Sequence, residues 1–266
     1  MTVPGRGLAA ALGLFTVCPV PARDTGPPPE HVVLWLPVVG ALAGGAAVLP
    51  ALAVWRAGTR GSPLLAGVLI VTVLAAATRG LHLDGLADLA DGLGSRRPAA
   101  DALAVMRRSD VGPFGVATIV LTLLIQVASL ATVLAASTRI EACVLVVLSA
   151  VTGRVAVVQA AGTGVPSARS DGFGALVAGT VGTTERRFVT GLVLTGAVAA
   201  ELGTGGSLAR ACLVAGAVAA GLTAAWLLRG HAVRRLGGVT GDVFGALVEV
   251  GSSATLLVLA IGAVWR

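Results

Sequence analysis

The sequence has 266 residues, of which 56% are hydrophobic and only 12% are charged, and its mean hydropathy is +0.92. A soluble domain of this length needs many more charges to cover its surface, so the composition argues against a soluble enzyme and indicates a membrane protein. All 19 basic residues are arginine, and we attribute the net charge of +6 to membrane topology and expect no nucleic-acid partner. The three isolated cysteines predict neither a disulfide framework nor a zinc site.

The N-terminal segment, residues 1–31, has the outline of a secretory signal peptide, with Arg6 before an apolar run from residue 8 to residue 20. Gly13 and Pro19 interrupt that run, and no soluble domain follows it. We therefore expect a retained interfacial or re-entrant helix rather than a cleaved leader.

Seven further apolar segments are long enough to cross a bilayer, which takes about 20 residues. They lie at 32–55, 63–81, 113–136, 140–161, 188–204, 208–228 and 243–264. The weakest is 188–204, which is short and ends near Glu201. The sequence therefore predicts an all-α fold, a polytopic transmembrane bundle of about seven spans that forms one catalytic domain over residues 1–266.

Arginine is distributed unequally between the two sets of loops that seven spans create. One set contains the N-terminus and the loops 82–112, 162–187 and 229–242, and 14 of the 19 arginines belong to it when those at span ends are assigned to the nearest side. The positive-inside rule places this set in the cytoplasm. We therefore expect a multi-pass protein of the cell inner membrane with a cytoplasmic N-terminus and an active site at the cytoplasmic face.

The loop 82–112 begins with the most polar stretch, which we expect to continue the second span as a helix. Asp84, Asp88 and Asp91 follow at i, i+4 and i+7, so they share a stripe about 60° wide on one helix face. Such crowded carboxylates repel one another, and bound Mg²⁺ would relieve the repulsion. We therefore predict a magnesium site, with a solvated acidic face as the alternative. His82 points nearly the opposite way and is interpreted as a packing or substrate-binding residue rather than a metal ligand.

The same loop ends with Arg107, Arg108 and Ser109, just before Pro113, which we expect to open the third span at its first turn. A helix N-terminus preceded by two arginines and a serine is a ready anion site, so these three residues are candidates for substrate binding. Asp110 either caps this helix or completes the metal shell, and it is a candidate catalytic base.

Two deeper regions carry further polar residues. Arg154, inside the fourth span, should face protein or a polar cavity, either as a phosphate clamp or as the partner of a carboxylate. The segment 229–249 carries a second acidic pair, Asp242 and Glu249, at i and i+7. Asp242 is another candidate base, and Thr240 and Glu249 are candidates for substrate binding, with a buried neutral or paired Glu249 as the alternative.

Four segments, taken together and in order, resemble adenosylcobinamide-GDP ribazoletransferases, the cobalamin synthase family. They are Phe15–Pro21, Gly80–Gly92, Met106–Gly115 and Gly237–Ala246, of which the second and fourth are specific. Members of this family often carry an Asp two residues after the Met of the third segment. Here that place is Arg108, and an acid follows instead at Asp110.

The resemblance implies an integral membrane enzyme that performs the last assembly step of cobalamin. Adenosylcobinamide-GDP would react with α-ribazole or its 5′-phosphate, with Mg²⁺ as cofactor, and GMP would leave. The metal would bridge the diphosphate, and Arg107, Arg108 and Arg154 would offset the remaining charge. One of Asp91, Asp110 and Asp242 would accept the proton of the attacking hydroxyl. The lipid bilayer is an expected partner, and a homo-oligomer is compatible with the sequence.

Two other classes stay open. Asp88-x-x-Asp91-Gly92 loosely resembles the acidic signature of CDP-alcohol phosphatidyltransferases, although this chain lacks that family's Ala-Arg after the glycine and its downstream acidic motif. A cation-coupled transporter would use the aspartate stripe as an ion pathway. It would distribute its charges through the bilayer midplane, whereas here they cluster toward one face.

Overall fold

The structure, a computed structural model, describes residues 4–20, 31–56 and 62–264, so most of residues 21–31 of the predicted N-terminal segment lie outside it. Within these residues the fold is all-helical, with two isolated β-bridges and no strand. The elements are α1 (Pro4–Phe15), the 3₁₀ helix η1 (Val32–Trp35), α2 (Leu36–Arg56), α3 (Pro63–Ala77), α4 (Leu81–Gly94), α5 (Ala99–Val105), α6 (Pro113–Ala136), α7 (Arg139–Ala160), α8 (Gly172–Val177), α9 (Thr183–Gly203), α10 (Leu208–Leu236) and α11 (Gly241–Val264).

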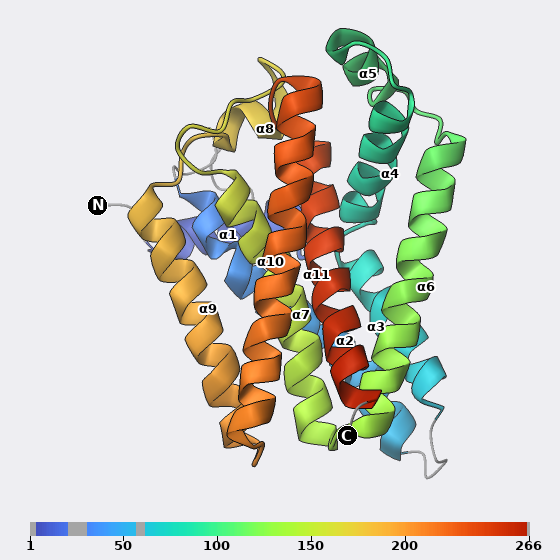
Figure 1. Cartoon of the computed structure of the whole chain (residues 1–266). Helices are drawn as coiled ribbons and strands as arrows, with labels where there is room; N and C mark the ends of the chain where they lie inside the picture. Colours follow the sequence, from blue (N-terminus) through green and yellow to red (C-terminus); the bar gives the residue numbers. More distant parts are fainter. Residues whose placement is uncertain (1–3, 21–30, 57–61, 265–266) are drawn as a thin grey trace.

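Helix α11 lies at the centre of the bundle, where it packs against α4, α6, α7 and α10 (Figure 1). Glycines on its neighbours allow this close approach. A Cβ added to Gly153 of α7 would lie 2.6 Å from the carbonyl oxygen of Val248, and one added to Gly221 of α10 would lie 2.5 Å from that of Gly251. Membrane helices associate mainly through such close packing of small residues, because lipid tails are as apolar as leucine.

Five helical stretches in the described chain are long and apolar enough to cross a membrane, and the bent pair α3–α4 makes six if it counts as one span. The five are Val32–Trp55, α6, α7, α10 and α11. The sequence predicted about seven. The segment 188–204 falls within α9, which also carries Glu185, Arg186, Arg187 and Glu201 and is not among the qualifying helices.

The acidic stretch does not continue the second span as an unbroken helix, so that prediction was wrong. Helix α3 ends at Ala77, α4 begins at Leu81, and their axes differ by 87°. Arg79 and Gly80 have φ values of 54° and 71°, in the left-handed region that interrupts a right-handed helix. Apolar residues flank the break on both sides, so only Gly80 signalled it in the sequence.

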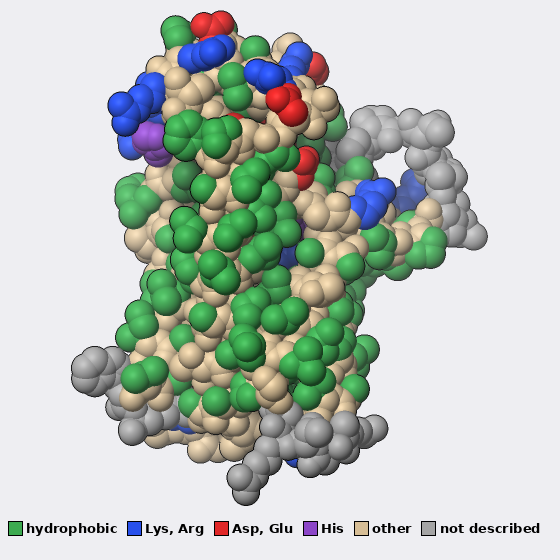
Figure 2. Space-filling view, turned by 90° about the vertical axis from the view of Figure 1, so that its right-hand side faces the viewer, with side chains coloured by type: hydrophobic (Ala, Val, Ile, Leu, Met, Phe, Trp, Pro, Cys, Tyr) green, Lys and Arg blue, Asp and Glu red, His purple; other side chains and the backbone are tan. Residues whose placement is uncertain are grey.

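The two ends of the bundle differ. One, called here the loop end, consists of residues 95–112, 161–182 and 237–240 and holds the short helices α5 and α8 (Figure 1). At the opposite end, the links 137–138 and 204–207 are short. Figure 2 shows charged side chains gathered at the loop end, above a broad apolar flank. The side of the membrane that this end faces stays a prediction.

Helix α1 is a 12-residue helix that packs against η1 and α2. The chain just after it is tied to the bend, because the Val17 N–H donates to the Ala77 carbonyl at 2.8 Å. The N-terminal segment is therefore part of the bundle. Its predicted place at the membrane interface stays a prediction.

Helices α4 and α11 touch through two glycines. A Cβ added to Gly85 would lie 2.7 Å from the backbone oxygen of Asp242, and one added to Gly245 would lie 3.2 Å from Cα of His82. Both distances are too short for an ordinary side-chain contact. These two positions therefore determine how close the acidic segment of α4 lies to the start of α11.

Replacing Gly85 by Ala should push α4 away from α11 and lower the free energy of unfolding by about 1–3 kcal/mol, the usual cost of overpacking. Thermal unfolding in detergent measures this as a lower melting temperature. Gly216→Ala in α10 is the matched control, because an added Cβ there meets nothing within 4 Å. It should raise the melting temperature or leave it unchanged, since Ala favours a helix over Gly by about 1 kcal/mol. Equal melting of the two variants would contradict the close contact.

Candidate active site

Three carboxylates from two helices meet where α4 touches α11. Asp84 and Asp88 lie one turn apart on α4, and Asp242 lies in the first turn of α11, whose backbone contacts Gly85. The negative charges of Asp84 and Asp242 both repel that of Asp88, and Asp84 also repels Asp242. Asp84 is exposed and the other two are half-buried. Crowding of like charges in partly buried surroundings is unfavourable, and a positive group nearby offsets it.

Arg169 supplies one positive charge, and it is not among the site residues that the sequence predicted. Its Nη1 donates to Oδ2 of Asp242 at 3.4 Å, and its Nη2 donates to the Leu103 carbonyl at 3.1 Å. It also attracts the charge on Asp88. The hydroxyl of Thr240 donates to the same Oδ2 of Asp242 at 3.2 Å, so this predicted substrate-binding residue instead orients a carboxylate.

A short pairing between two distant loops holds Arg169 in place. The Ala168 N–H donates to the Val239 carbonyl at 3.0 Å, and the Val239 N–H donates to the Pro166 carbonyl at 2.9 Å. Sequence periodicity carries no information about such a loop-to-loop pairing. The one available signal was an arginine in the expected loop 162–187.

The structure places the carboxylate of Asp91 at the start of α6, and its predicted roles as a metal ligand and a base stay predictions. Its Oδ2 accepts from the Gly112 N–H at 2.7 Å, and its Oδ1 accepts from the Gly115 N–H at 3.0 Å. Gly112 is the N-cap of α6 and Pro113 its first residue, as expected, so Asp91 satisfies free N–H groups at the positive end of that helix. The predicted anion site at the start of α6 is thus filled by the protein's own carboxylate.

The predicted phosphate-binding arginines of the 95–112 loop form ion pairs at the surface. Arg107 bonds Asp171 at 2.9 and 3.0 Å, and Arg108 bonds Asp110 at 3.0 and 2.9 Å. The side chains of both ion pairs are exposed, and so is that of Ser109, which follows Arg108 in the sequence. The bonds from Arg108 hold the pKa of Asp110 below its usual value, which makes Asp110 a weak proton acceptor. Asp110 therefore does not cap α6, and its role as a base loses support.

A cavity of about 220 Å³ lies beside the carboxylates. Its polar lining comes from Asp84, His82, Arg154 and Asp242, and the rest of its wall is apolar and comes from α1, α2, α4, α7, α8 and α11. His82 and Arg154 are both buried. The structure thus brings together four of the predicted site residues from three helices around one space.

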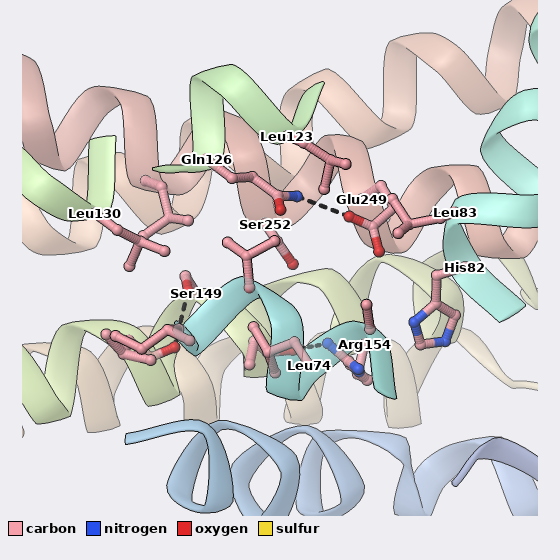
Figure 3. A pocket seen from close by; sticks show the side chains of 16 residues that line it. Leu74, His82, Leu83, Leu123, Gln126, Leu130, Ser149, Arg154, Glu249 and Ser252 are labelled. Carbon is pink, nitrogen blue, oxygen red and sulfur yellow. Dashed lines mark hydrogen bonds between the residues drawn. The ribbon is translucent and has the colours of Figure 1, made fainter. Parts of the chain in front are cut away.

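A smaller chamber of about 30 Å³ lies beyond His82 and Arg154, and it has room for about one water molecule. Figure 3 shows its main contact, in which Nε2 of Gln126 donates to Oε2 of Glu249 at 2.7 Å. Arg154 donates to the Ala150 carbonyl at 3.3 Å and attracts the charge of Glu249. Glu249 is therefore a paired group, which was the alternative to substrate binding. Arg154 bonds a backbone carbonyl and also borders the larger cavity.

Across the residues that the structure describes, no group of three or more Asp, Glu, His or Cys side chains is arranged to hold a metal ion. Asp91 bonds the start of α6 and also repels the charge on Asp88, while Asp84 and Asp88 lie near Asp242. Mg²⁺ in phosphotransfer sites is commonly held by one or two carboxylates together with substrate phosphates. The carboxylates at the α4–α11 contact are compatible with that mode, and the metal stays a prediction.

Asp91→Asn should destabilise the protein by about 1–3 kcal/mol, because the amide NH₂ would face one of two backbone donors and the negative charge at the start of α6 would be lost. The measurement is the melting temperature in detergent. Asp84→Asn is the matched control, and it should melt at the wild-type temperature or above, since it relieves repulsion. A wild-type melting temperature for Asp91→Asn would contradict the capping role.

Comparison with known proteins agrees with the resemblance in the motifs. The family model described as cobalamin-5-phosphate synthase matches residues 7–260. Proteins named adenosylcobinamide-GDP ribazoletransferase include one from Frankia casuarinae, 42% identical over 84% of this chain and 81% of its own length. One from a Nocardioides strain is 39% identical over 93% and 95%, and one from Chlorobaculum tepidum is 36% identical over 96% and 95%.

No solved structure matches this chain significantly. The match to the family model nevertheless covers all four motif segments and every residue of the site described above. The chain therefore belongs to the cobalamin-5-phosphate synthase family, whose curated members are transferases named adenosylcobinamide-GDP ribazoletransferase.

Proposed function

We propose that this enzyme joins adenosylcobinamide-GDP to α-ribazole, or to its 5′-phosphate, and releases GMP in a Mg²⁺-dependent reaction at the cytoplasmic face of the inner membrane. The observation that carries the proposal is the meeting of Asp84, Asp88 and Asp242 beside a cavity at the α4–α11 contact. Family membership supports the overall reaction, and the arginine bias of the loops supports the orientation.

Asp84 and Asp88 are the residues that would hold Mg²⁺, together with phosphate oxygens of the substrate, because a divalent cation relieves their repulsion. Bound there, Mg²⁺ would neutralise the diphosphate and stabilise the charge that develops on it during transfer. Each oxygen of Asp91 accepts one backbone N–H and keeps a second lone pair, so Asp91 stays a predicted ligand beside them.

Arg169 offers the diphosphate a positive charge beside these carboxylates. Its bond to Asp242 is long, at 3.4 Å, so the guanidinium can turn from the carboxylate to a phosphate oxygen. The exposed Arg107 and Arg108 would act only after release from Asp171 and Asp110. Arg169 therefore replaces them in this proposal as the main phosphate-binding cation.

Asp242 is the candidate base that the contacts favour over Asp91 and Asp110. Both side-chain bonds described for it end on Oδ2, which leaves Oδ1 for the substrate hydroxyl. A P–O bond would form between the 3′-oxygen of α-ribazole and the phosphorus attached to cobinamide. The bond from that phosphorus to the oxygen of GMP would break, and the hydroxyl proton would pass to Asp242.

Asp84→Asn and Asp88→Asn should each lower the rate of GMP release by about 100-fold or more, because charge stabilisation by a metal contributes several kcal/mol and each 1.4 kcal/mol is tenfold in rate. Purified protein is assayed with both substrates across a Mg²⁺ series. Asp101→Asn, on the exposed face of α5, is the control and should keep wild-type activity. Full activity in both test variants would overturn the proposed site.

Two further readouts distinguish a lipid phosphotransferase and a transporter from the proposed enzyme. Release of CMP from a CDP-alcohol, with no GMP from adenosylcobinamide-GDP, would make the protein a lipid phosphotransferase. Cation-coupled uptake into proteoliposomes without release of either nucleotide would make it a transporter. GMP release with formation of the cobalamin product supports the proposal.

Arg169→Ala should lower kcat/KM for adenosylcobinamide-GDP by about 10–100-fold, the usual worth of one charge-assisted hydrogen bond of roughly 1.5–3 kcal/mol. Arg169→Lys should recover part of the loss, since it keeps the charge without the two-pronged geometry. Arg234→Ala, at an exposed position of α10, is the matched control and should behave as wild type. An unchanged kcat/KM in Arg169→Ala would remove Arg169 from the phosphate site.

A further inference from the structure

Three phenylalanines from distant parts of the chain line one side of the 220 Å³ cavity. The ring centroids of Phe15 and Phe173 are 5.0 Å apart, those of Phe173 and Phe244 are 5.9 Å apart, and both pairs meet edge to face. The whole chain has only five phenylalanines and no tyrosine. Their gathering at the site, on α1, α8 and α11, therefore creates a local aromatic surface beside the carboxylates.

Aliphatic side chains form the rest of the apolar wall, with Leu14 from α1 and Val248 from α11 among them. Leu36 and Val39 come from α2, Val157 from α7 and Leu81 from α4. At about 220 Å³ the space is smaller than the roughly 300–1,000 Å³ of pockets that enclose drug-sized ligands. It can receive a single fused ring system, and it is far too small for a corrinoid.

The polar lining of the cavity restricts what can occupy it. Asp84 and Asp242 both border the space, while the charge of Arg154 attracts Glu249 in the smaller chamber. A neutral aromatic group that carries hydroxyls fits both the aromatic wall and the carboxylates, since its ring faces the phenylalanines and its hydroxyls can bond the carboxylates.

We propose that this cavity is the acceptor subsite, in which the flat benzimidazole base of α-ribazole lies among Phe15, Phe173 and Phe244 and the ribose lies toward Asp84 and Asp242. This inference rests on the proposed function and adds to it the residues that select the base. The donor nucleotide then occupies the side of the carboxylates nearer Arg169, and the corrinoid stays outside the bundle.

Phe173→Leu tests the subsite, because Phe173 is half-buried and contacts both other rings. In purified enzyme it should raise KM for α-ribazole about tenfold, the effect of a few methylene-sized contacts in an apolar pocket, and leave KM for adenosylcobinamide-GDP unchanged. Phe188→Leu is the matched control, since Phe188 is 68% exposed on α9 and should keep both KM values.

A second acceptor separates base recognition from a general structural defect. The wild-type enzyme should prefer α-ribazole to the analogue that lacks the two methyl groups of the base, by about tenfold or more in kcat/KM. Phe173→Leu should reduce that preference. An unchanged preference, or a rise in KM confined to adenosylcobinamide-GDP, would overturn the subsite.

Ligand-induced stabilisation gives a readout that does not need turnover. α-Ribazole alone should raise the melting temperature of the wild-type protein and of Phe188→Leu but not that of Phe173→Leu. If the wild-type protein released no GMP but α-ribazole still stabilised it through Phe173, the proposed function would fail and the subsite would stand. Normal GMP release with equal stabilisation of all three proteins would overturn the subsite alone. A lipid that copurifies with the wild type and is lost in Phe173→Leu would also overturn it.

Discussion

The contact between α4 and α11 is the constraint on which the site depends. Gly85 lies against the backbone at Asp242, and Gly245 lies against the backbone at His82, so each helix presents a glycine to the other at the same level. With side chains at those positions the helices would separate, and the carboxylates of α4 would no longer share a space with Asp242. The glycines that helix propensity disfavours here are thus what allows two distant acidic segments to form one site.

The carboxylates around this contact fall into two groups, one that stabilises the fold and one that lies beside the cavity. Both oxygens of Asp91 accept N–H groups at the start of α6, and these two bonds offset the cost of burying the carboxylate. Asp84, Asp88 and Asp242 repel one another, and the arginine that the structure places beside them, Arg169, offsets only part of that repulsion. The carboxylate with two backbone hydrogen bonds stabilises the fold, whereas the three carboxylates that repel one another lie beside the cavity.

Local spacing determined how much of the site could be predicted. Asp84 and Asp88 share a helix face because they are four residues apart, so their proximity follows from the period of the helix. The partners of Asp91 and Asp242 could not be predicted in this way. Asp91 reaches Gly112 across a loop, and Arg169 reaches Asp242 through a pairing between two loops. The all-helical membrane fold followed from composition, whereas the break did not, because only three residues, Thr78, Arg79 and Gly80, separate two stretches of helical pattern.

The 87° bend at Thr78–Gly80 has a consequence for the position of α4. Helices α3 and α4 both lie along α6, so the break falls partway along a candidate span (Figure 1). Hydrocarbon cannot satisfy the free backbone groups of an interrupted helix, and such breaks are tolerated only inside protein or beside an aqueous space. The first turn of α4 borders the cavity through Leu81, His82 and Asp84. The bend therefore brings the start of α4, with His82 and Asp84, to the cavity partway along a candidate span.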